Sequence, residues 1–271
     1  MTSDMEEELE RVRGIVEAEL YRIRAEKIFP LELYDSAFHL PLSGGKRLRP
    51  FLVIESAKIW DPREERALPP ALAVELLHSF TLIHDDVMDN DEFRRGVPTT
   101  HVIWGIPMAI NAGDALFSLL FSYLVKEMRK LAFTPEEIVS AVELLADSAL
   151  KICEGQVMDV LAERYIPSED RYLEMISKKT ASLFEASCLL GGLVGGASEE
   201  EMNHLRDFGL NAGITFQIID DILGLVGDPK VTGKPAGTDI RRGKRTLIVI
   251  KALEEASDEE RAEILSILGK E

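Results

Sequence analysis

Three aspartates follow an apolar segment and are themselves followed by two adjacent arginines. Residues 82–96 read LIHDDVMDNDEFRRG, which contains Asp85, Asp86, Asp89, Arg94 and Arg95. Residues four apart share one face of a helix, so Asp85 and Asp89 are expected to lie one above the other. Carboxylates at the end of a buried helix are costly unless a cation neutralises them. Their oxygen-only chemistry predicts a hard ion such as Mg²⁺, shared with phosphate oxygens.

A second acidic pair repeats this design, because FQIIDDIL places Asp220 and Asp221 at the end of another apolar run. Basic residues stand at the breaks between apolar segments. They are Lys46, Arg47, Arg49, Lys178, Lys179, Lys234, Lys244 and Arg245. One acidic pair alone is more often a solvated helix end. Two such clusters with many nearby bases favour a diphosphate substrate held by metal ions, Lys and Arg. No glycine-rich P-loop sequence for a nucleotide phosphate is present.

The composition excludes some classes of partner. The 271 residues include 48 Asp and Glu against 31 Lys and Arg, which gives a formal net charge of −17. Such a surface repels nucleic acid and anionic lipid headgroups, so we expect no nucleic-acid partner. Cys153 and Cys188 lack metal or redox spacing and are expected to be reduced thiols. The acidic N-terminal segment has no apolar signal-peptide core, and we expect a cytoplasmic protein.

One segment, residues 102–125, is apolar and long enough to span a membrane. It carries Asn111 and Asp114 near its middle, together with Pro107. An Asp at the bilayer centre costs about 2.5–3.5 kcal/mol. A central helix of a thick all-α core explains the same composition. We therefore expect a core helix and no stable membrane insertion.

Apolar residues recur at helical spacing through nearly the whole chain. Helices are expected at 6–27, 51–60, 71–89, 107–131, 135–163, 169–194, 199–223 and from Lys244 onward. Breaks or loops rich in Gly, Pro and charge are expected at 41–50, 61–70, 90–100 and 224–243. The last is long enough to be a functional loop. No alternating strand pattern occurs, so the simplest prediction is one all-α domain over residues 1–271.

Seven motifs in register resemble the trans-isoprenyl diphosphate synthases, also called polyprenyl synthases. They are GGKRLRP at 44–50, LIHDDVMDNDEFRRGVPTTH at 82–101, GDALF at 113–117, EGQVMD at 154–159, KKTASLF at 178–184, FQIIDDILGLVGD at 216–228 and GKPAGTDIRRGKRT at 233–246. One of them alone would be weak, but seven in order are specific and cover nearly the whole chain. The resemblance implies a single-domain bundle of long, mostly antiparallel helices around a deep central cavity, usually as a homodimer.

The resemblance also implies a role for each matching residue. The first metal and allylic diphosphate site would comprise Asp85, Asp86, Asp89 and Arg94. The isopentenyl diphosphate site would comprise Lys46, Arg47, His78 and Arg95. The remaining metal and the leaving group would be held by Lys179, Thr180, Gln217, Asp220, Asp221, Lys234 and Lys244. Two or three Mg²⁺ ions are expected.

The implied reaction is the head-to-tail condensation of isopentenyl diphosphate with an allylic diphosphate. The cations would stabilise the charge that develops on the departing diphosphate, while an apolar cavity keeps water from the carbocation. Phe80 and Thr81 lie about one turn deeper than Asp85 and would form the cavity floor. An aromatic residue there, with a two-residue spacer between the aspartates, resembles archaeal-type geranylgeranyl diphosphate synthases and implies a C20 product. The alternative is that Phe80 only packs the core.

Several other functions remain open. A farnesyl diphosphate synthase is the alternative with a different product. A non-catalytic subunit of a heteromeric prenyl synthase is the alternative of another class. Such subunits usually lose the first aspartates, which this chain keeps. A terpene cyclase would not need both the GGKR and GKRT segments. A metal phosphohydrolase using His84 and Asp85 would need further His ligands in a recognisable motif.

The chain departs from the family pattern at two places. Gly224 stands where the second acidic motif usually has its third aspartate, so one expected metal contact lacks its usual carboxylate. Asp228 could contribute to it through a water molecule. The chain also ends at Glu271, where relatives usually continue through several more helices. We therefore expect that it lacks the C-terminal helices of the family.

Overall fold

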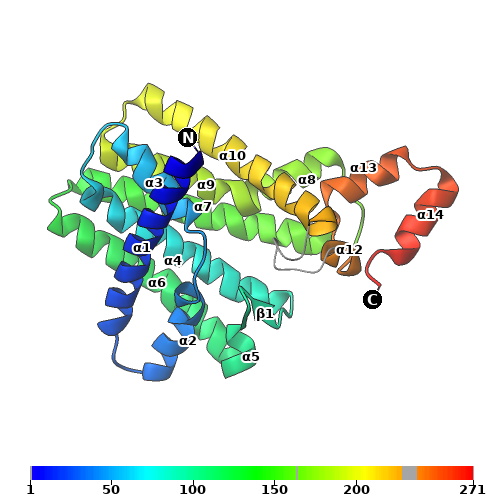
Figure 1. Ribbon diagram of the computed structural model, residues 1–271, viewed down its shortest axis with the longest axis horizontal. Helices are drawn as coiled ribbons and strands as arrows, with labels where there is room; N and C mark the ends of the chain where they lie inside the picture. The colour runs from blue at the N-terminus through cyan, green and yellow to red at the C-terminus, as the bar shows by residue number, and fades with distance from the viewer. Residues whose placement is uncertain (1, 163, 228–236, 271) are drawn as a thin grey trace. The chain divides into compact units, whose positions relative to one another are not determined.

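The computed structural model describes residues 2–162, 164–227 and 237–270, and these are almost entirely helical (Figure 1). The prediction of an all-α fold is confirmed. The chain divides into two compact units, and each is described by itself. Unit 1 consists of Met1–Asp147 and Ala186–Arg206, and unit 2 consists of Ser148–Glu185 and Asp207–Glu271.

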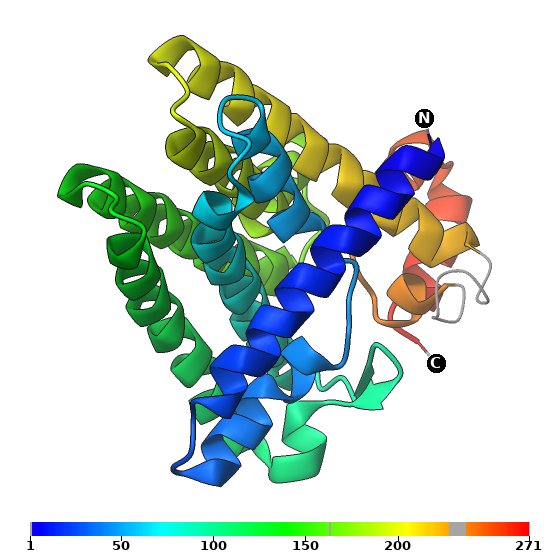
Figure 2. The same ribbon diagram turned by 60° about the vertical axis from the view of Figure 1, so that its left-hand side comes forward.

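Unit 1 is built around a central helix. It contains α1 (Thr2–Ala25), α2 (Leu31–Leu42), α3 (Leu48–Lys58), α4 (Glu64–Met88), α5 (Thr100–Trp104) and α6 (Ile106–Lys130). Helix α4 contacts each of the other five, and α6 lies alongside it (Figure 2). Leu72, Leu76 and Ile83 of α4 are fully buried, as expected for a helix enclosed by neighbours. The helix that carries the first aspartates is therefore firmly anchored.

Unit 2 holds the second acidic pair. It contains α8 (Glu169–Ile176), the π-helical turn η1 (Ser177–Ala181), α12 (Thr238–Arg241), α13 (Leu247–Glu255) and α14 (Asp258–Ile267). Residues of α7 (Pro135–Ala162), α9 (Ser182–Gly195) and α10 (Glu199–Val226) belong to both units. The core of unit 2 includes Tyr172 and Ile176 of α8 packed with Ile250 of α13.

Two predicted breaks are partly helical. Helix α4 begins at Glu64 and includes Pro69 and Pro70, whereas a break was expected through residue 70. Each proline withdraws one backbone donor, but its fixed φ suits a helix and both rings are buried in the core. Pro41 likewise lies inside the last turn of α2. Tertiary burial outweighs the local breaker signal at these positions.

The segment expected to be a plain loop at 90–100 contains a small hairpin. Strands β1 (Phe93–Arg94) and β2 (Val97–Pro98) pair antiparallel, with Arg94 opposite Val97. Arg95 and Gly96 form the two-residue connection, and both have positive φ, 53° and 77°. Two successive positive φ values are typical of a type I′ turn, whose twist matches that of the strands. Strands of two residues are too short to show an alternating pattern.

The other predicted helices differ from the observed ones by a few residues at their ends, whereas α2, α5 and α12 were not predicted. The helix predicted at 169–194 is divided into α8, η1 and α9, and α10 continues to Val226 inside the predicted 224–243 loop. By length and composition, α6 and α10 could each cross a membrane, but a core helix of a soluble protein passes the same test. The absence of membrane insertion and the single domain stay predictions.

Candidate functional site

The first three aspartates lie in and just after the last turn of α4. Asp86 is only 1% exposed, Asp85 is half-buried and Asp89 is exposed. The amide of Asp89 donates to the Asp85 carbonyl over 2.8 Å, so Asp85 and Asp89 are stacked as expected. The carboxyl end of a helix carries partial negative charge, which adds to their mutual repulsion. Negative charge is therefore concentrated at this end of α4, and nearby cations stabilise it.

Arg94 supplies one of these cations from the hairpin. Its Nε donates to Asp86 Oδ1 over 2.5 Å, and its Nη2 lies 3.6 Å from Asp91 Oδ2. Burial raises the pKa of the Asp86 carboxyl to about 6, although Arg94 opposes the shift. The structure thus brings Arg94 to the acidic end of α4, next to the aspartates with which it was predicted to act.

Arg47 and Arg49 have different surroundings although they lie two residues apart. The Arg47 side chain is fully buried, donates to Glu75 and also donates from Nη2 to the Pro41 carbonyl over 2.5 Å. Arg49 Nη1 lies 3.2 Å from His78 Nε2. Burial lowers the pKa of Arg49 to about 10, so it is charged at neutral pH. These contacts favour Arg49, which was not among the predicted site residues, over Arg47 as an anion ligand; the role of Arg47 stays a prediction.

His78 lies within a group of arginines. Its pKa is well below the ordinary value because it is buried and because Arg49, Arg95, Arg94 and Arg47 repel a further positive charge. A neutral His78 can accept a hydrogen bond from Arg49 and donate from its other ring nitrogen. Such a concentration of positive charge suits a multiply charged anion. Lys46 is exposed at the edge of the same segment.

Arg95 reaches this group from the turn of the hairpin. Its Nη1 donates to the Gly44 carbonyl, and burial lowers the pKa of its guanidinium. A Cβ at Gly45 would fall 2.9 Å from Arg95 Cζ, so only glycine lets the guanidinium approach this closely. The glycines of GGKRLRP therefore shape the place where Arg95 lies.

In unit 2, Asp221 ends a chain of hydrogen bonds. Thr180 Oγ1 donates to Gln217 Oε1 over 2.7 Å, and Gln217 Nε2 donates to Asp221 Oδ1 over 2.9 Å. The buried Tyr172 hydroxyl donates to the other Asp221 oxygen. Burial raises the pKa of Asp221, while these two donors oppose the shift. Asp220 is exposed beside it. Thr180, Gln217 and Asp221, three predicted site residues, therefore belong to one network.

Lys179 and Thr180 lie in the π-helical turn η1. Single π turns inside helices are rare and occur frequently at functional sites. Lys179 Nζ donates to Asp159 Oδ2 over 2.6 Å, and a Cβ at Gly155 would fall 2.3 Å from the Lys179 backbone nitrogen. Asp159 was not predicted as a site residue, although it is the last residue of the EGQVMD motif.

The space beside Gly224 is taken by another carboxylate. A Cβ at Gly224 would fall 2.5 Å from Asp239 Oδ2, and Lys244 Nζ lies 3.9 Å from Asp239 Oδ1. Asp239 therefore stands close to where a third aspartate of the motif would begin, a contact that the sequence did not predict. The predicted Lys234, like Asp228, lies outside the described residues.

The carboxylates fit Mg²⁺ as a partial ligand set. Among the described residues, no three His, Cys, Asp or Glu side chains are grouped so that they could hold an ion by themselves. Mg²⁺ is usually held by one or two carboxylates, several waters and substrate phosphates. The stacked Asp85 and Asp89 of unit 1, and Asp220 of unit 2, match that limited requirement. The alternative His84 metal site gains no support, because His84 Nε2 lies 3.2 Å from the Ile110 carbonyl.

The predicted floor residues lie one turn below the aspartates. The half-buried Phe80 ring is 4.8 Å from the His84 ring and 5.0 Å from the Phe117 ring, measured between centroids. The Thr81 hydroxyl donates to the His78 carbonyl over 2.8 Å. Phe80 is thus stacked against α6 without being fully enclosed, which favours the floor over simple core packing.

The comparisons with known proteins agree with these features. The polyprenyl synthetase family model matches residues 31–271. A geranylgeranyl diphosphate synthase of Sulfolobus acidocaldarius is 46% identical over 88% of this chain and 72% of its own length. A geranylfarnesyl diphosphate synthase of Aeropyrum pernix is 44% identical over 89% of this chain and 76% of its own length. The solved geranylgeranyl pyrophosphate synthetase of Pyrococcus horikoshii superposes with a TM-score of 0.91, at 42% identity over 98% of this chain and 81% of that one.

Proposed function

The chain belongs to the polyprenyl synthetase family, and on this premise we propose that it is a short-chain trans-prenyltransferase. It would condense isopentenyl diphosphate with an allylic diphosphate, with geranylgeranyl diphosphate (C20) as the main product. The observation that carries the proposal is the face of α4. His78 and Asp85 are seven residues, about two turns, apart and share that face. One helix therefore presents an arginine-lined anion site and a metal-dependent one, which suits two diphosphate substrates.

The residues of unit 1 would bind and orient both substrates. Arg94 would hold the allylic diphosphate beside the aspartates, and Arg49, His78, Arg95 and Lys46 would hold isopentenyl diphosphate. When bound, Mg²⁺ neutralises charge on the diphosphate leaving group. The allylic carbon–oxygen bond breaks, a carbon–carbon bond forms to the isopentenyl double bond, and a proton is then lost, with the departed diphosphate as its acceptor.

The residues of unit 2 would bind the leaving diphosphate and the remaining metal. They are Lys179, Thr180, Gln217, Asp220, Asp221, Lys234 and Lys244. The network of Thr180, Gln217 and Asp221 supports this role because it holds the side chains in fixed positions. We include two or three Mg²⁺ ions in the proposal.

A C20 product is supported by Phe80 and by the relatives. Phe80 stacks on α6 at the depth predicted for a floor, and several similar proteins are named geranylgeranyl diphosphate synthases. One relative is named a geranylfarnesyl diphosphate synthase, so a single scaffold serves neighbouring chain lengths. We further propose a cytoplasmic homodimer; the exposed Val102, Ile103, Ile106 and Ile110 of α5 and α6 offer an apolar surface for a second copy.

A product assay tests the proposal. The 271-residue protein is incubated with Mg²⁺, labelled isopentenyl diphosphate and separately the C5, C10 and C15 allylic primers, and the dephosphorylated alcohols are chromatographed. A C20 alcohol that disappears with EDTA is expected. Asp85→Asn should abolish it, whereas Glu143→Gln, an exposed acid on α7, should not. Folded protein that elongates no primer would refute the proposal and favour a non-catalytic subunit.

A further inference from the structure

The hairpin of β1 and β2 carries two consecutive arginines that would serve different substrates. Arg94 would hold the allylic diphosphate, and Arg95 would hold isopentenyl diphosphate. A displacement of the hairpin would therefore weaken the binding of both substrates together. Its polar contacts with the rest of unit 1 include those of the arginines themselves, from Arg94 to Asp86 and from Arg95 to the Gly44 carbonyl. Since both arginines must also serve the substrates, the hairpin needs a further link for which no substrate competes.

His39 of α2 provides such a link to the hairpin backbone. Its Nε2 lies 2.8 Å from the carbonyl oxygen of Pro98 at the end of β2. A carbonyl oxygen only accepts, so Nε2 carries a hydrogen and donates it. The half-buried imidazole is also held from its side, because its ring centroid lies 5.2 Å from that of Trp104 in α5, edge to face. Helix α2, the hairpin and α5 are thus joined at one histidine (Figure 1).

Close apolar packing does not hold β2 against α2. A pocket of about 330 Å³ lies between them, and its lining includes Phe38, His39 and Leu42 of α2 together with Val97 of β2. A side chain beside open space lacks the contacts that close packing would give it. The hydrogen bond from His39 at the edge of this pocket is therefore a main constraint on the position of the strand.

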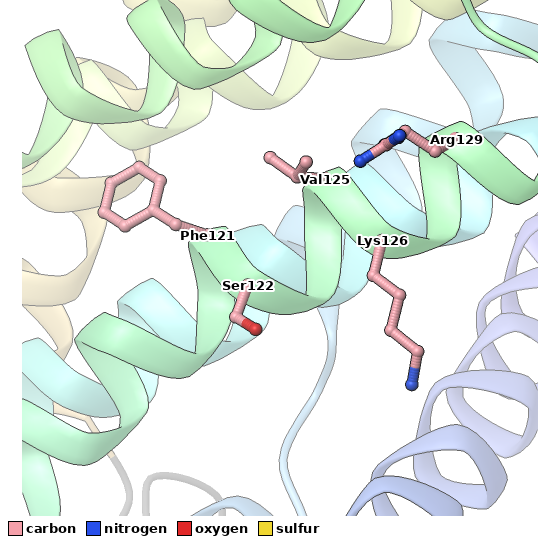
Figure 3. Close-up of a pocket in the computed structure, with 5 residues that line it drawn as sticks. All are labelled: Phe121, Ser122, Val125, Lys126 and Arg129. Atoms are coloured by element: carbon pink, nitrogen blue, oxygen red, sulfur yellow. The ribbon is translucent and has the colours of Figure 1, made fainter.

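A larger pocket on α6 has no comparable connection to the substrate site. It measures about 580 Å³ and is lined by Phe121, Ser122, Val125, Lys126 and Arg129. Figure 3 shows that all five side chains project from α6. None of the five is a predicted ligand of a diphosphate. The smaller pocket, in contrast, borders the strand that directly follows the two arginines of the hairpin.

We propose that His39 is a positioning residue for both substrates. It holds the hairpin by the Pro98 carbonyl and thereby sets the positions of Arg94 and Arg95. The inference rests on the proposed function, which assigns these arginines to the two diphosphates. His39 contacts the hairpin backbone and not the substrates, so its effect on the allylic substrate should pass through Arg94. Its effect on isopentenyl diphosphate should likewise pass through Arg95.

Two substitutions at His39 separate the hydrogen bond from the ring. His39→Phe keeps an aromatic ring beside Trp104 but has no donor. His39→Gln has an amide nitrogen at the same number of bonds from Cβ as Nε2 and can donate to Pro98. His39→Phe should raise the KM of both substrates by about 2- to 10-fold, the worth of one hydrogen bond, and His39→Gln should restore most of the loss. His204→Phe, the same change at an exposed histidine of α10, is the matched control.

A double-mutant cycle tests the route of the effect. In the Arg94→Met background, His39→Phe should leave the KM of the allylic substrate unchanged and still raise that of isopentenyl diphosphate. In the Arg95→Met background, the two responses should be exchanged. The dissociation constant of isopentenyl diphosphate, measured by calorimetry without an allylic primer, should also rise in His39→Phe. This last measurement requires no turnover.

Specific outcomes would overturn the inference. Unchanged KM values in His39→Phe, with or without a lowered Tm, would leave the histidine a structural role only. A change in one KM alone, or additive effects throughout the cycle, would show that His39 does not act through the hairpin. A His39→Gln variant without rescue would assign the effect to the ring. If His39→Phe does not fold, His39→Asn replaces it, because its shorter amide cannot reach the carbonyl. A wild type that makes no product refutes the proposed function instead, and the calorimetric comparison still decides the role of His39.

Discussion

Replacing Glu75 with glutamine should expose the role of Arg47. The two side chains are 2% and 0% exposed and form an ion pair. Removing one partner of a buried pair leaves an uncompensated charge and costs about 3–5 kcal/mol. Arg47 would keep the Pro41 carbonyl at 2.5 Å and Glu17 at 3.7 Å. We therefore expect the lower end, about 3 kcal/mol, which lowers Tm by roughly 6 °C.

The measurement compares Glu75→Gln with the double variant Arg47→Met/Glu75→Leu. Both are unfolded by urea and by heat while circular dichroism is followed. The double variant should regain most of the lost stability, because an apolar pair of similar volume removes the buried charge entirely. A loss below about 1 kcal/mol in Glu75→Gln, or a double variant no more stable than the single one, would refute the reasoning.

The same variants separate structure from binding. If Arg47 is structural and Arg49 is the diphosphate ligand, the double variant should keep a KM for isopentenyl diphosphate close to that of the wild type. Arg49→Met should raise that KM by about 10- to 100-fold, the worth of a charge-assisted hydrogen bond. Equal increases in KM in the double variant and in Arg49→Met would show that Arg47 also binds isopentenyl diphosphate.

Three further outcomes are expected. The raised pKa of Asp86, about 6 against an ordinary 3.8, means that stability falls as pH rises between these values, so Asp86→Asn should raise Tm in EDTA at pH 7 but not at pH 4. Gly224→Asp places a second carboxylate against Asp239, whose side-chain end can move aside, so it should lower stability by no more than about 1 kcal/mol in urea unfolding through like-charge repulsion, and adding Asp239→Asn should reverse the loss. Tyr172→Phe leaves the buried Asp221 short of a donor and should cost about 1–3 kcal/mol in the same assay. A gain in Tm that is independent of pH would contradict the prediction for Asp86→Asn. A double variant no more stable than Gly224→Asp would contradict the second prediction, and an unchanged urea midpoint in Tyr172→Phe would contradict the third.

Local periodicity explains why much of the site could be predicted. The stacking of Asp85 and Asp89 needs only the 3.6-residue repeat, and the long helices follow from apolar spacing. The start of α4 could not be found in this way, because Pro69 and Pro70 are breakers by local rules and are accommodated only by burial in the finished core.

Contacts between segments distant in sequence were the part that could not be predicted. Arg47 and Arg49 occupy the same charged break, and the positions of Glu75 and His78 on α4 distinguish them. The approach of Asp239 to Gly224 likewise joins residues of two different helices, α12 and α10. Sequence spacing reports neighbours on one helix, whereas these pairs depend on how helices pack.

The π-helical turn holds one residue more than an α-helix would need at the same place. A π-helix turns by a smaller angle per residue than an α-helix, so the five residues of Ser177–Ala181 turn through about the same angle as four α-helical residues. The flanking helices α8 and α9 therefore keep the relative orientation of one continuous helix. Tyr172 before the turn contacts Asp221, and Lys179 within it contacts Asp159. Deleting one residue of the turn should leave the Tyr172 contact in place and displace that of Lys179, so the extra residue serves the position of the turn's own side chains.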